Sequence, residues 1–270
     1  MAGTARVLAI AGSDSGGGAG IQADIKTVTM LGAYAATAVT AVTVQDTTGV
    51  SAVHPVPPEL VAAQIRAVLA DIGADCVKIG MLGGRATISA VAAALSDFAG
   101  PIVLDPVMAA KGGAPLLEAE AVAALAEELL PRASVLTPNV PECAALSGTE
   151  IEDEADLLLA AQELLALGPA AVLAKGGHLA GAEVADWLVT RHGHRRFAGR
   201  RIETRHTHGT GCTLASALAA LLARGVPLEA AVAGARDYVA GAIRAAPGLG
   251  AGHGPLGHGW PLCRAGTDAA

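Results

Sequence analysis

The sequence predicts an α/β fold: a mostly parallel central sheet between two layers of helices, with an antiparallel hairpin at one edge. Three observations predict it. Short apolar segments rich in Val, Ile and Leu recur along the chain, segments with apolar residues at helical spacing separate them, and one later stretch breaks the alternation. Strands buried on both faces of a parallel sheet have this composition, and the helices between them would form the crossovers.

Six segments have the composition of buried strands. They are residues 7–11, 38–44, 76–79, 102–105, 134–137 and 171–174. Apolar residues at helical spacing between the second and third segments predict a helix. These residues are Leu60, Ile65, Val68 and Leu69. The crossovers between neighbouring parallel strands should be right-handed.

The stretch that breaks the alternation predicts the hairpin. Residues 187–190 and 195–204 flank the polar residues 191–194, as antiparallel strands at a sheet edge would. Because no linker or internal repeat divides the sequence, we expect a single domain over residues 1–262. We expect residues 263–270 to be a disordered tail.

The segment that precedes this tail is rich in Gly and Pro from residue 247 onward, which predicts irregular structure. It contains a literal G-x-G-x-x-G pattern at Gly252, Gly254 and Gly257. A dinucleotide-binding pattern needs a preceding strand and a following helix. We expect neither here, so we interpret the match as accidental.

Composition excludes several functions. The chain has 270 residues, 52% of them hydrophobic and 16% charged, so it can bury a large core. A net charge of −7 argues against nucleic-acid binding, which needs clustered Lys and Arg, and two Trp, two Tyr and two Phe are too few for a base-stacking platform. No apolar stretch reaches the roughly 18 residues of a membrane span. The N-terminus also lacks the layout of a signal peptide.

The cysteines indicate a reducing compartment. Cys76, Cys143, Cys212 and Cys263 are widely spaced, without the close pairs of a zinc site or a disulfide framework. We therefore expect free thiols and a cytoplasmic location.

Polar and glycine residues gather directly after the predicted strands. These segments are residues 12–20, 45–49, 80–81, 105–108, 139–142, 175–178 and, after the hairpin, 208–213. In an open parallel sheet, ligands bind beyond the carboxyl ends of the strands. This clustering predicts a functional site at that edge.

The first glycine loop, residues 12–20, stands between a strand and a helix that begins near Ile21. It lacks the Lys and Ser/Thr of a P-loop, and it does not contain G-x-G-x-x-G. The loop alone is equally consistent with closure over a substrate and with a flexible turn. Asp24, expected on the first turn of the helix, would either interact with the helix dipole or face a ligand.

The second glycine loop, residues 208–213, leads into a helix with leucines on one face and Gly225 as its expected end. Consecutive backbone N–H groups at a helix N-terminus attract negative charge. We expect this environment to lower the pKa of Cys212. The alternative is a small buried residue packed at a tight turn.

Together these segments resemble the hydroxymethylpyrimidine/phosphomethylpyrimidine kinases of the ribokinase-like superfamily. The resemblance rests on residues 11–24, 78–82, 137–142 and 207–213, supported by 103–108 and 175–178. They follow family order from about residue 7 to residue 260. Related sugar kinases usually carry Asp where this chain has Cys212. Asp46, where Asn is commoner, and the glycine-rich ending at residues 252–260 depart from the family pattern.

The resemblance implies a three-layer α/β/α fold and a reaction. ATP would donate its γ-phosphoryl group to 4-amino-5-hydroxymethyl-2-methylpyrimidine, and then to the monophosphate, in thiamine biosynthesis. It also implies Mg²⁺ and a homodimer. The partners would be ATP and a small pyrimidine, with no nucleic acid and no membrane.

The resemblance also implies roles for individual residues. The catalytic residues would be Gly209, Thr210, Gly211 and Cys212, whose backbone amides form the second loop. The Cys212 side chain would act as a base or would position the substrate hydroxyl. The pyrimidine would contact Gly12, Asp24, Thr43, Gln45, Met81 and Val107. The nucleotide would contact Asn139, Lys175 and Thr207, and the hard oxygens of Asp105 and Glu142 would hold Mg²⁺. The amide of Gln45 suits an aminopyrimidine edge, because it both donates and accepts hydrogen bonds. His178, His206 and His208 lack metal-ligand spacing, so we interpret them as structural.

Other functions stay open at this point. A pyridoxal or pyridoxine kinase shares the fold and the reaction type, and a hydroxyethylthiazole kinase is a weaker alternative. A pyrimidine-binding regulatory protein without catalysis is an alternative from another class, although an intact anion loop with Glu142 and Lys175 argues against it. A cysteine hydrolase is disfavoured, because no His or Asn is placed as an obvious partner of the cysteine.

Overall fold

The computed structural model describes residues 3–109, 113 and 116–265. Its centre is an eight-stranded sheet in the order β10-β9-β8-β7-β6-β5-β1-β2. The strands are β1 (Arg6–Ala11), β2 (Tyr34–Val39), β5 (Cys76–Ile79), β6 (Ile102–Leu104), β7 (Val135–Leu136), β8 (Ala171–Lys175), β9 (Glu183–Thr190) and β10 (Gly193–Arg200). The pairs from β2 to β8 are parallel, and β8-β9 and β9-β10 are antiparallel. The predicted α/β fold with an antiparallel edge hairpin is therefore confirmed.

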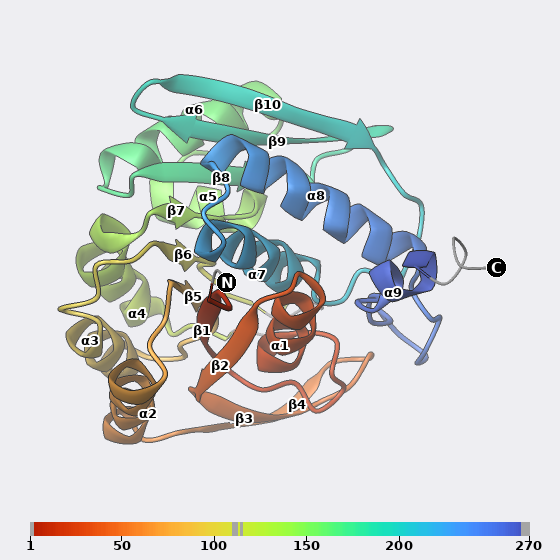
Figure 1. Cartoon of the computed structure of the whole chain (residues 1–270). Helices are drawn as coiled ribbons and strands as arrows, with labels where there is room; N and C mark the ends of the chain where they lie inside the picture. The colour runs from red at the N-terminus through yellow and green to blue at the C-terminus, as the bar shows by residue number, and fades with distance from the viewer. Residues whose placement is uncertain (1–2, 110–112, 114–115, 266–270) are drawn as a thin grey trace.

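Helices cover both faces of this sheet (Figure 1). They are α1 (Gly20–Met30), α2 (Pro58–Asp71), α3 (Arg85–Ala94), α4 (Ala119–Ala124), the π-helix η1 (Leu125–Leu129), the 3₁₀ turn η2 (Leu130–Arg132), α5 (Val140–Ser147), α6 (Glu154–Ala166), α7 (Thr210–Ala223), α8 (Leu228–Arg244) and α9 (Trp260–Ala265). Within the described ranges, no helix is long and apolar enough to cross a bilayer.

The hydrophobic core lies in two layers, one on each face of the sheet. Helices α2 to α6 contribute side chains such as Ile65 and Leu157 to one layer, and α1, α7 and α8 contribute Val28 and Leu218 to the other. Neighbouring residues of one strand enter opposite layers, because successive side chains point to opposite faces. Strands buried on both sides in this way account for the short, wholly apolar segments of the sequence.

One predicted strand is wrong in extent. Residues 38–44 form the end of β2 and most of a separate strand, β3 (Ala41–Gln45). The chain turns at Thr40, whose hydroxyl donates to the carbonyl oxygen of Met81 at 2.7 Å. Beyond it, β3 pairs with β4 (Val50–Pro55) in a two-stranded antiparallel ribbon. The sequence does not predict β4, because this strand has no buried face to produce an alternating pattern.

The C-terminal segment also differs from the expectation. It ends in α9, which contains residues 263–265 that we expected to be disordered. Residues 266–270 lie outside the described residues. The prediction that the segment before α9 lacks regular structure is confirmed for residues 247–259, which form no helix or strand.

Candidate active site

A lysine and two carboxylates meet at the carboxyl ends of β6, β7 and β8. Lys175 Nζ lies 2.8 Å from Asp105 Oδ1 and 4.0 Å from Glu142 Oε2, and Thr137 donates a hydrogen bond to the same Asp105 oxygen at 2.9 Å. Burial lowers the pKa of Lys175, but the two carboxylates outweigh burial and hold this pKa above its ordinary value. The structure thus brings together three residues that the sequence analysis assigned to nucleotide and metal.

Glu142 is held in place by the start of α5. Asn139 is the N-cap of this helix: its Oδ1 accepts from the Glu142 amide at 3.0 Å, and its own amide donates to Glu142 Oε2 at 2.8 Å. This reciprocal arrangement satisfies two backbone donors that a helix start leaves without partners. Asn139 therefore positions a carboxylate, in addition to any contact with a nucleotide.

The chemistry of this group fits a divalent cation. Burial raises the pKa of Glu142 to about 7; Lys175 opposes the rise and the Asp105 carboxylate adds to it. A cation beside the two carboxylates would relieve their repulsion. Among the described residues, no group of three or more His, Cys, Asp or Glu could hold a metal alone. Two carboxylates suffice for Mg²⁺, which usually takes its remaining oxygens from water and substrate phosphates.

The second glycine loop lies directly against this charged group. Gly209 is the N-cap of α7 with φ 81°, and a Cβ on it would overlap the carbonyl oxygen of Gly18. A Cβ on Gly211 would lie 3.3 Å from Lys175 Nζ and 3.6 Å from Asp105 Oδ2. The first amides of a helix have no carbonyl partners within it, so they can bind an anion. The predicted anion-binding turn therefore faces the predicted metal group.

Thr207 stands just before this turn. Its carbonyl oxygen accepts hydrogen bonds from the Thr210 amide at 3.4 Å and from the Thr210 hydroxyl at 3.2 Å. Thr207 thus shapes the turn through its backbone.

The expectation of a lowered pKa at Cys212 is wrong. Burial raises the pKa of this thiol to about 11; the Lys78 ammonium opposes the rise, and the carboxylates of Asp24 and Asp105 reinforce it. Desolvation disfavours the thiolate more strongly than the Lys78 ammonium favours it. At neutral pH, Cys212 is therefore a thiol.

Asp24 forms a buried ion pair with Lys78. It is fully buried on the second turn of α1, and both of its oxygens lie 2.9 Å from Lys78 Nζ. Ser216 of α7 donates to Asp24 Oδ1 at 2.6 Å. Asp24 has no exposed surface in this structure, and its role as a substrate contact stays a prediction. The pair joins α1, β5 and α7.

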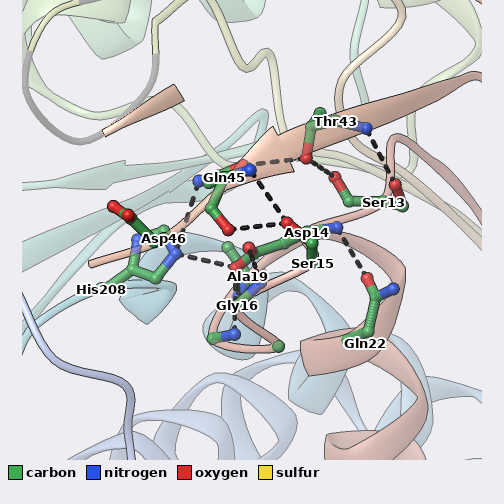
Figure 2. Close-up of polar contacts among 12 residues, drawn as sticks. Ser13, Asp14, Ser15, Gly16, Ala19, Gln22, Thr43, Gln45, Asp46 and His208 are labelled. Carbon is green, nitrogen blue, oxygen red and sulfur yellow. Dashed lines mark hydrogen bonds and ion pairs between the residues drawn. The ribbon is translucent and has the colours of Figure 1, made fainter. Parts of the chain in front are cut away.

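Asp14 organises the first glycine loop and was missed by the sequence analysis. Its Oδ1 accepts from the amide of Gly16 at 2.8 Å, and its Oδ2 accepts from the amides of Gly18 at 2.9 Å and Ala19 at 2.7 Å (Figure 2). His208 Nε2 lies 2.8 Å from the same Oδ2. Burial raises the pKa of Asp14, but these hydrogen bonds outweigh it and hold the pKa below its ordinary value. The signal in the sequence was an Asp inside a glycine run, since Asp favours such turns.

Two predicted pyrimidine contacts lie beside this loop on β3. Thr43 donates to the carbonyl oxygen of Ser13 at 2.9 Å, and the Ser13 hydroxyl accepts from the Thr43 amide at 3.1 Å (Figure 2). The Gln45 amide reaches toward the second loop, with its Nε2 3.4 Å from His208 Nε2. Gln45 and the anion-binding turn therefore share one neighbour, His208.

The remaining predicted contacts lie at the ends of β1, β5 and β6. A Cβ on Gly12 would lie 2.9 Å from Met81 Sδ, so the absence of a side chain lets the methionine approach the loop. Val107 follows Asp105 by two residues, and its amide donates to the Asp105 carbonyl oxygen at 2.8 Å. These three positions and the charged group occupy the same edge of the sheet.

An open cavity of about 810 Å³ lies at the opposite edge. Its lining includes residues that precede β7 and β8, such as Ser134 and Ala170. None of the predicted site residues lines this cavity, so we do not identify it as the active site.

The profile of the family described as phosphomethylpyrimidine kinase matches residues 14–257. A hydroxymethylpyrimidine/phosphomethylpyrimidine kinase of Rhizobium meliloti is 52% identical over 258 residues, which cover 94% of this chain and 97% of that protein. The thiamine biosynthesis bifunctional protein of Geobacter sulfurreducens is also 52% identical, over 93% of this chain and 52% of that longer protein.

Among solved structures, the pyridoxal kinase of Staphylococcus aureus in complex with AMP-PCP and pyridoxal has a TM-score of 0.89 and 33% sequence identity. The match covers 96% of this chain and 95% of that one. The fold is thus common to kinases with different named substrates, whereas the profile and the sequence identities favour one of these groups. The chain belongs to the phosphomethylpyrimidine kinase family.

Proposed function

We propose that this protein is an ATP-dependent kinase of thiamine biosynthesis, which phosphorylates 4-amino-5-hydroxymethyl-2-methylpyrimidine and then its monophosphate. The observation that carries the proposal is the position of Gly211, on the first turn of α7, beside Lys175 and Asp105. Phosphoryl transfer depends mainly on positioning and on charge stabilisation. An amide-rich turn next to a lysine and two carboxylates supplies both.

On the phosphate side, the backbone amides of Gly209 to Cys212 would surround the migrating phosphoryl group. Lys175 would leave its carboxylate partners, Asp105 and Glu142, and would contact phosphate oxygens as a point charge. Asp105 and Glu142 would hold Mg²⁺, which would neutralise negative charge on the phosphates. Asn139 and Thr207 would contact the nucleotide or shape the groups that do.

On the pyrimidine side, Gln45 would read the amino and ring-nitrogen edge through its donor and acceptor. Thr43 would fix the strand that carries Gln45. Met81 and Val107 would pack against the ring, and Gly12 would leave room for it.

Cys212 would orient the acceptor hydroxyl as a thiol, not remove its proton as a resting thiolate. A pKa of about 11 makes a thiolate scarce near pH 7. As the bond from the hydroxyl oxygen to phosphorus forms and the bond to ADP breaks, the hydroxyl proton would pass to an oxygen of the transferred phosphoryl group. A loose transition state needs little help from a base. The Cys212→Ala variant tests this role: it should keep ATP binding and lose part of its turnover.

A parallel assay tests the function. Purified protein with ATP and Mg²⁺ is offered the hydroxymethylpyrimidine, its monophosphate and pyridoxal, and product formation is followed by mass spectrometry. We expect turnover of the first two. Turnover of pyridoxal alone would make the protein a pyridoxal kinase, an alternative kept open by the likeness to the Staphylococcus aureus enzyme. Tight pyrimidine binding without turnover would favour a regulatory protein.

We also propose a homodimer formed by a single-domain chain in the cytoplasm. The β3-β4 ribbon exposes Val42 by 53% and Val44 by 59%, an apolar surface that a second copy could cover. The free thiols agree with a reducing compartment. Light scattering on wild-type protein and on a Val42→Ser, Val44→Ser variant tests the assembly, because we expect only the variant to be monomeric.

A further inference from the structure

Residues 250–260, which we call the C-terminal strap, run past loops that lie far apart in the sequence. At its start, the strap holds the turn after β3. The amide of Gly252 donates to Thr47 Oγ1 at 3.2 Å, and the amide of His253 donates to the Thr47 carbonyl oxygen at 2.8 Å. Thr47 follows Gln45 by two residues, so the strap fixes the strand end that carries this predicted pyrimidine contact.

The middle of the strap contacts both glycine loops. The carbonyl oxygen of Gly254 accepts from the His208 amide at 3.2 Å, directly before the anion-binding turn. Pro255 lies so close to the first loop that a Cβ on Gly18 would be 3.1 Å from its Cβ. The two loops, 188 or more residues apart in the chain, therefore contact the same segment.

The end of the strap reaches the first turn of α7 through one side chain. His258 Nε2 lies 2.9 Å from Thr213 Oγ1, and both residues are buried, with 5% and 0% of their surface exposed. Thr213 follows Cys212, and its amide donates to the Gly209 carbonyl oxygen at 2.9 Å. A shift of His258 would therefore act on the turn whose amides face Lys175.

His258 is itself held firmly. Tyr238 of α8 donates from its hydroxyl to the His258 carbonyl oxygen at 2.8 Å, and Trp260 Nε1 donates to the Tyr238 carbonyl oxygen at 3.0 Å. Both the backbone and the ring of His258 are thus fixed. His258 can orient Thr213 only if its own position is fixed by such contacts.

The glycines of the strap explain its course. A Cβ on Gly252 would overlap the Thr47 carbonyl oxygen, one on Gly254 would overlap the His206 ring, and one on Gly257 would overlap the Ala245 carbonyl oxygen. The G-x-G-x-x-G pattern that we interpreted as accidental therefore has a structural cause: each glycine lets the strap lie directly against another part of the chain.

We propose that the C-terminal strap is a positioning element of the active site, and that His258 is the positioning residue that orients the anion-binding turn through Thr213. This inference rests on the proposed kinase function. It assigns a role in turnover to a segment that the sequence analysis set apart from the chemistry.

The test uses the full chain with His258→Leu and, as a matched control, His192→Leu at the exposed hairpin turn. We expect kcat to fall about tenfold or more in His258→Leu, because small displacements of positioning groups have effects of this size. Pyrimidine affinity, measured by calorimetry, should change less than twofold, because the contacts to Thr47 and Gly18 remain. His192→Leu should match wild type in both measurements.

A double variant, Thr213→Val with His258→Leu, separates orientation from stability. It removes both polar partners, so we expect its melting temperature to recover toward wild type while kcat stays low. Recovery of kcat along with the melting temperature, or an unchanged kcat in a less stable His258→Leu protein, would overturn the proposal.

Hydrogen exchange gives a readout that does not depend on activity. Amides 210–213 should exchange faster in His258→Leu than in wild type, and not in His192→Leu. If wild-type protein phosphorylates no pyrimidine, the proposed function fails, and unchanged exchange at these amides would separately contradict the strap's role.

Discussion

His208 Nε2 lies 2.8 Å from Asp14 Oδ2, although the two residues are 194 positions apart in the chain. The carboxylate also gathers amides of the first glycine loop, and His208 directly precedes Gly209 at the start of the second. One buried ion pair or hydrogen bond thus joins the loop beside the predicted pyrimidine contacts to the turn that faces Lys175. This contact makes the two glycine loops one structural unit.

The first prediction concerns this contact. In His208→Ala, Asp14 loses its side-chain partner, and a buried group without its hydrogen bond costs about 1–3 kcal/mol of unfolding free energy. We expect a loss of this size in urea unfolding, together with reduced turnover. His208→Asn, whose amide can donate to Asp14, should recover part of both. Equal losses in the two variants would show that the ring's volume matters, not its hydrogen bond. The exposed His54→Ala serves as a control.

The second prediction compares two glycines with similar backbones. Gly209 and Gly225 have φ of 81° and 77°, so alanine is strained at both. Only at Gly209 would a Cβ overlap another part of the chain, the Gly18 carbonyl oxygen. We expect Gly225→Ala to cost about 1 kcal/mol and to keep its activity. Gly209→Ala should lose several times more stability and nearly all turnover. Similar melting temperatures for the two variants would contradict the close approach of the loops.

Much of the site followed from the sequence because parallel strands align their carboxyl ends. Asp105, Asn139 and Lys175 come from three separate segments, and strand order alone brings them to one edge of the sheet. The contacts that sequence analysis missed depend on burial and on long-range pairing. Asp24 looked like a helix-start carboxylate, but its fully buried partner Lys78 is 54 residues away.

The state of Cys212 was missed for a related reason. A helix N-terminus can be recognised in a sequence, and its effect on a thiol has a known sign. Desolvation has the opposite effect on the pKa here, and it depends on how the folded chain surrounds the sulfur. The sequence therefore predicts correctly that Cys212 lies at a helix N-terminus, but it predicts the wrong protonation state for the thiol.

The third prediction follows from that state. With a pKa of about 11, alkylation of Cys212 by iodoacetamide should accelerate about tenfold per pH unit from pH 8 to pH 10. Peptide mass spectrometry follows the modification. The exposed Cys263 reports on the reagent, and the buried Cys76 and Cys143 report on unfolding. A rate that levels off below pH 9 would show that the α7 turn stabilises the thiolate after all.

The fourth prediction concerns Glu142, whose folded-state pKa of about 7 exceeds its ordinary value of 4.5. The folded protein therefore binds this proton more tightly than the unfolded chain does. The contribution to stability is full below about pH 4.5 and is lost as the pH rises to about 7, by roughly 3 kcal/mol at most. Glu142→Gln should flatten this part of the profile of unfolding free energy against pH.

Magnesium provides the complementary measurement on Glu142. Protonated carboxyl groups are poor ligands, so Mg²⁺ should raise the melting temperature of wild-type protein more above pH 7 than below it. Glu142→Gln should respond weakly at every pH, and Glu163→Gln on α6 is a control outside the site. An equal response of wild type and Glu142→Gln would remove this residue from the proposed metal site.

The fifth prediction concerns stability in acid, where the contribution of His258 changes with pH in the opposite direction to that of Glu142. Burial lowers the pKa of His258 from 6.5 to about 4, with a smaller effect in the same direction from the Lys26 ammonium. The unfolded chain therefore binds this proton more readily than the folded protein does. Its contribution to stability is full above about pH 6.5 and is lost as the pH falls to about 4, by roughly 3 kcal/mol. His258→Leu should be less sensitive to acid over this range than wild type or His192→Leu, in urea unfolding at fixed ionic strength. A variant that loses stability as steeply as wild type between pH 6.5 and pH 4 would show that His258 can be protonated without opening its contact with Thr213.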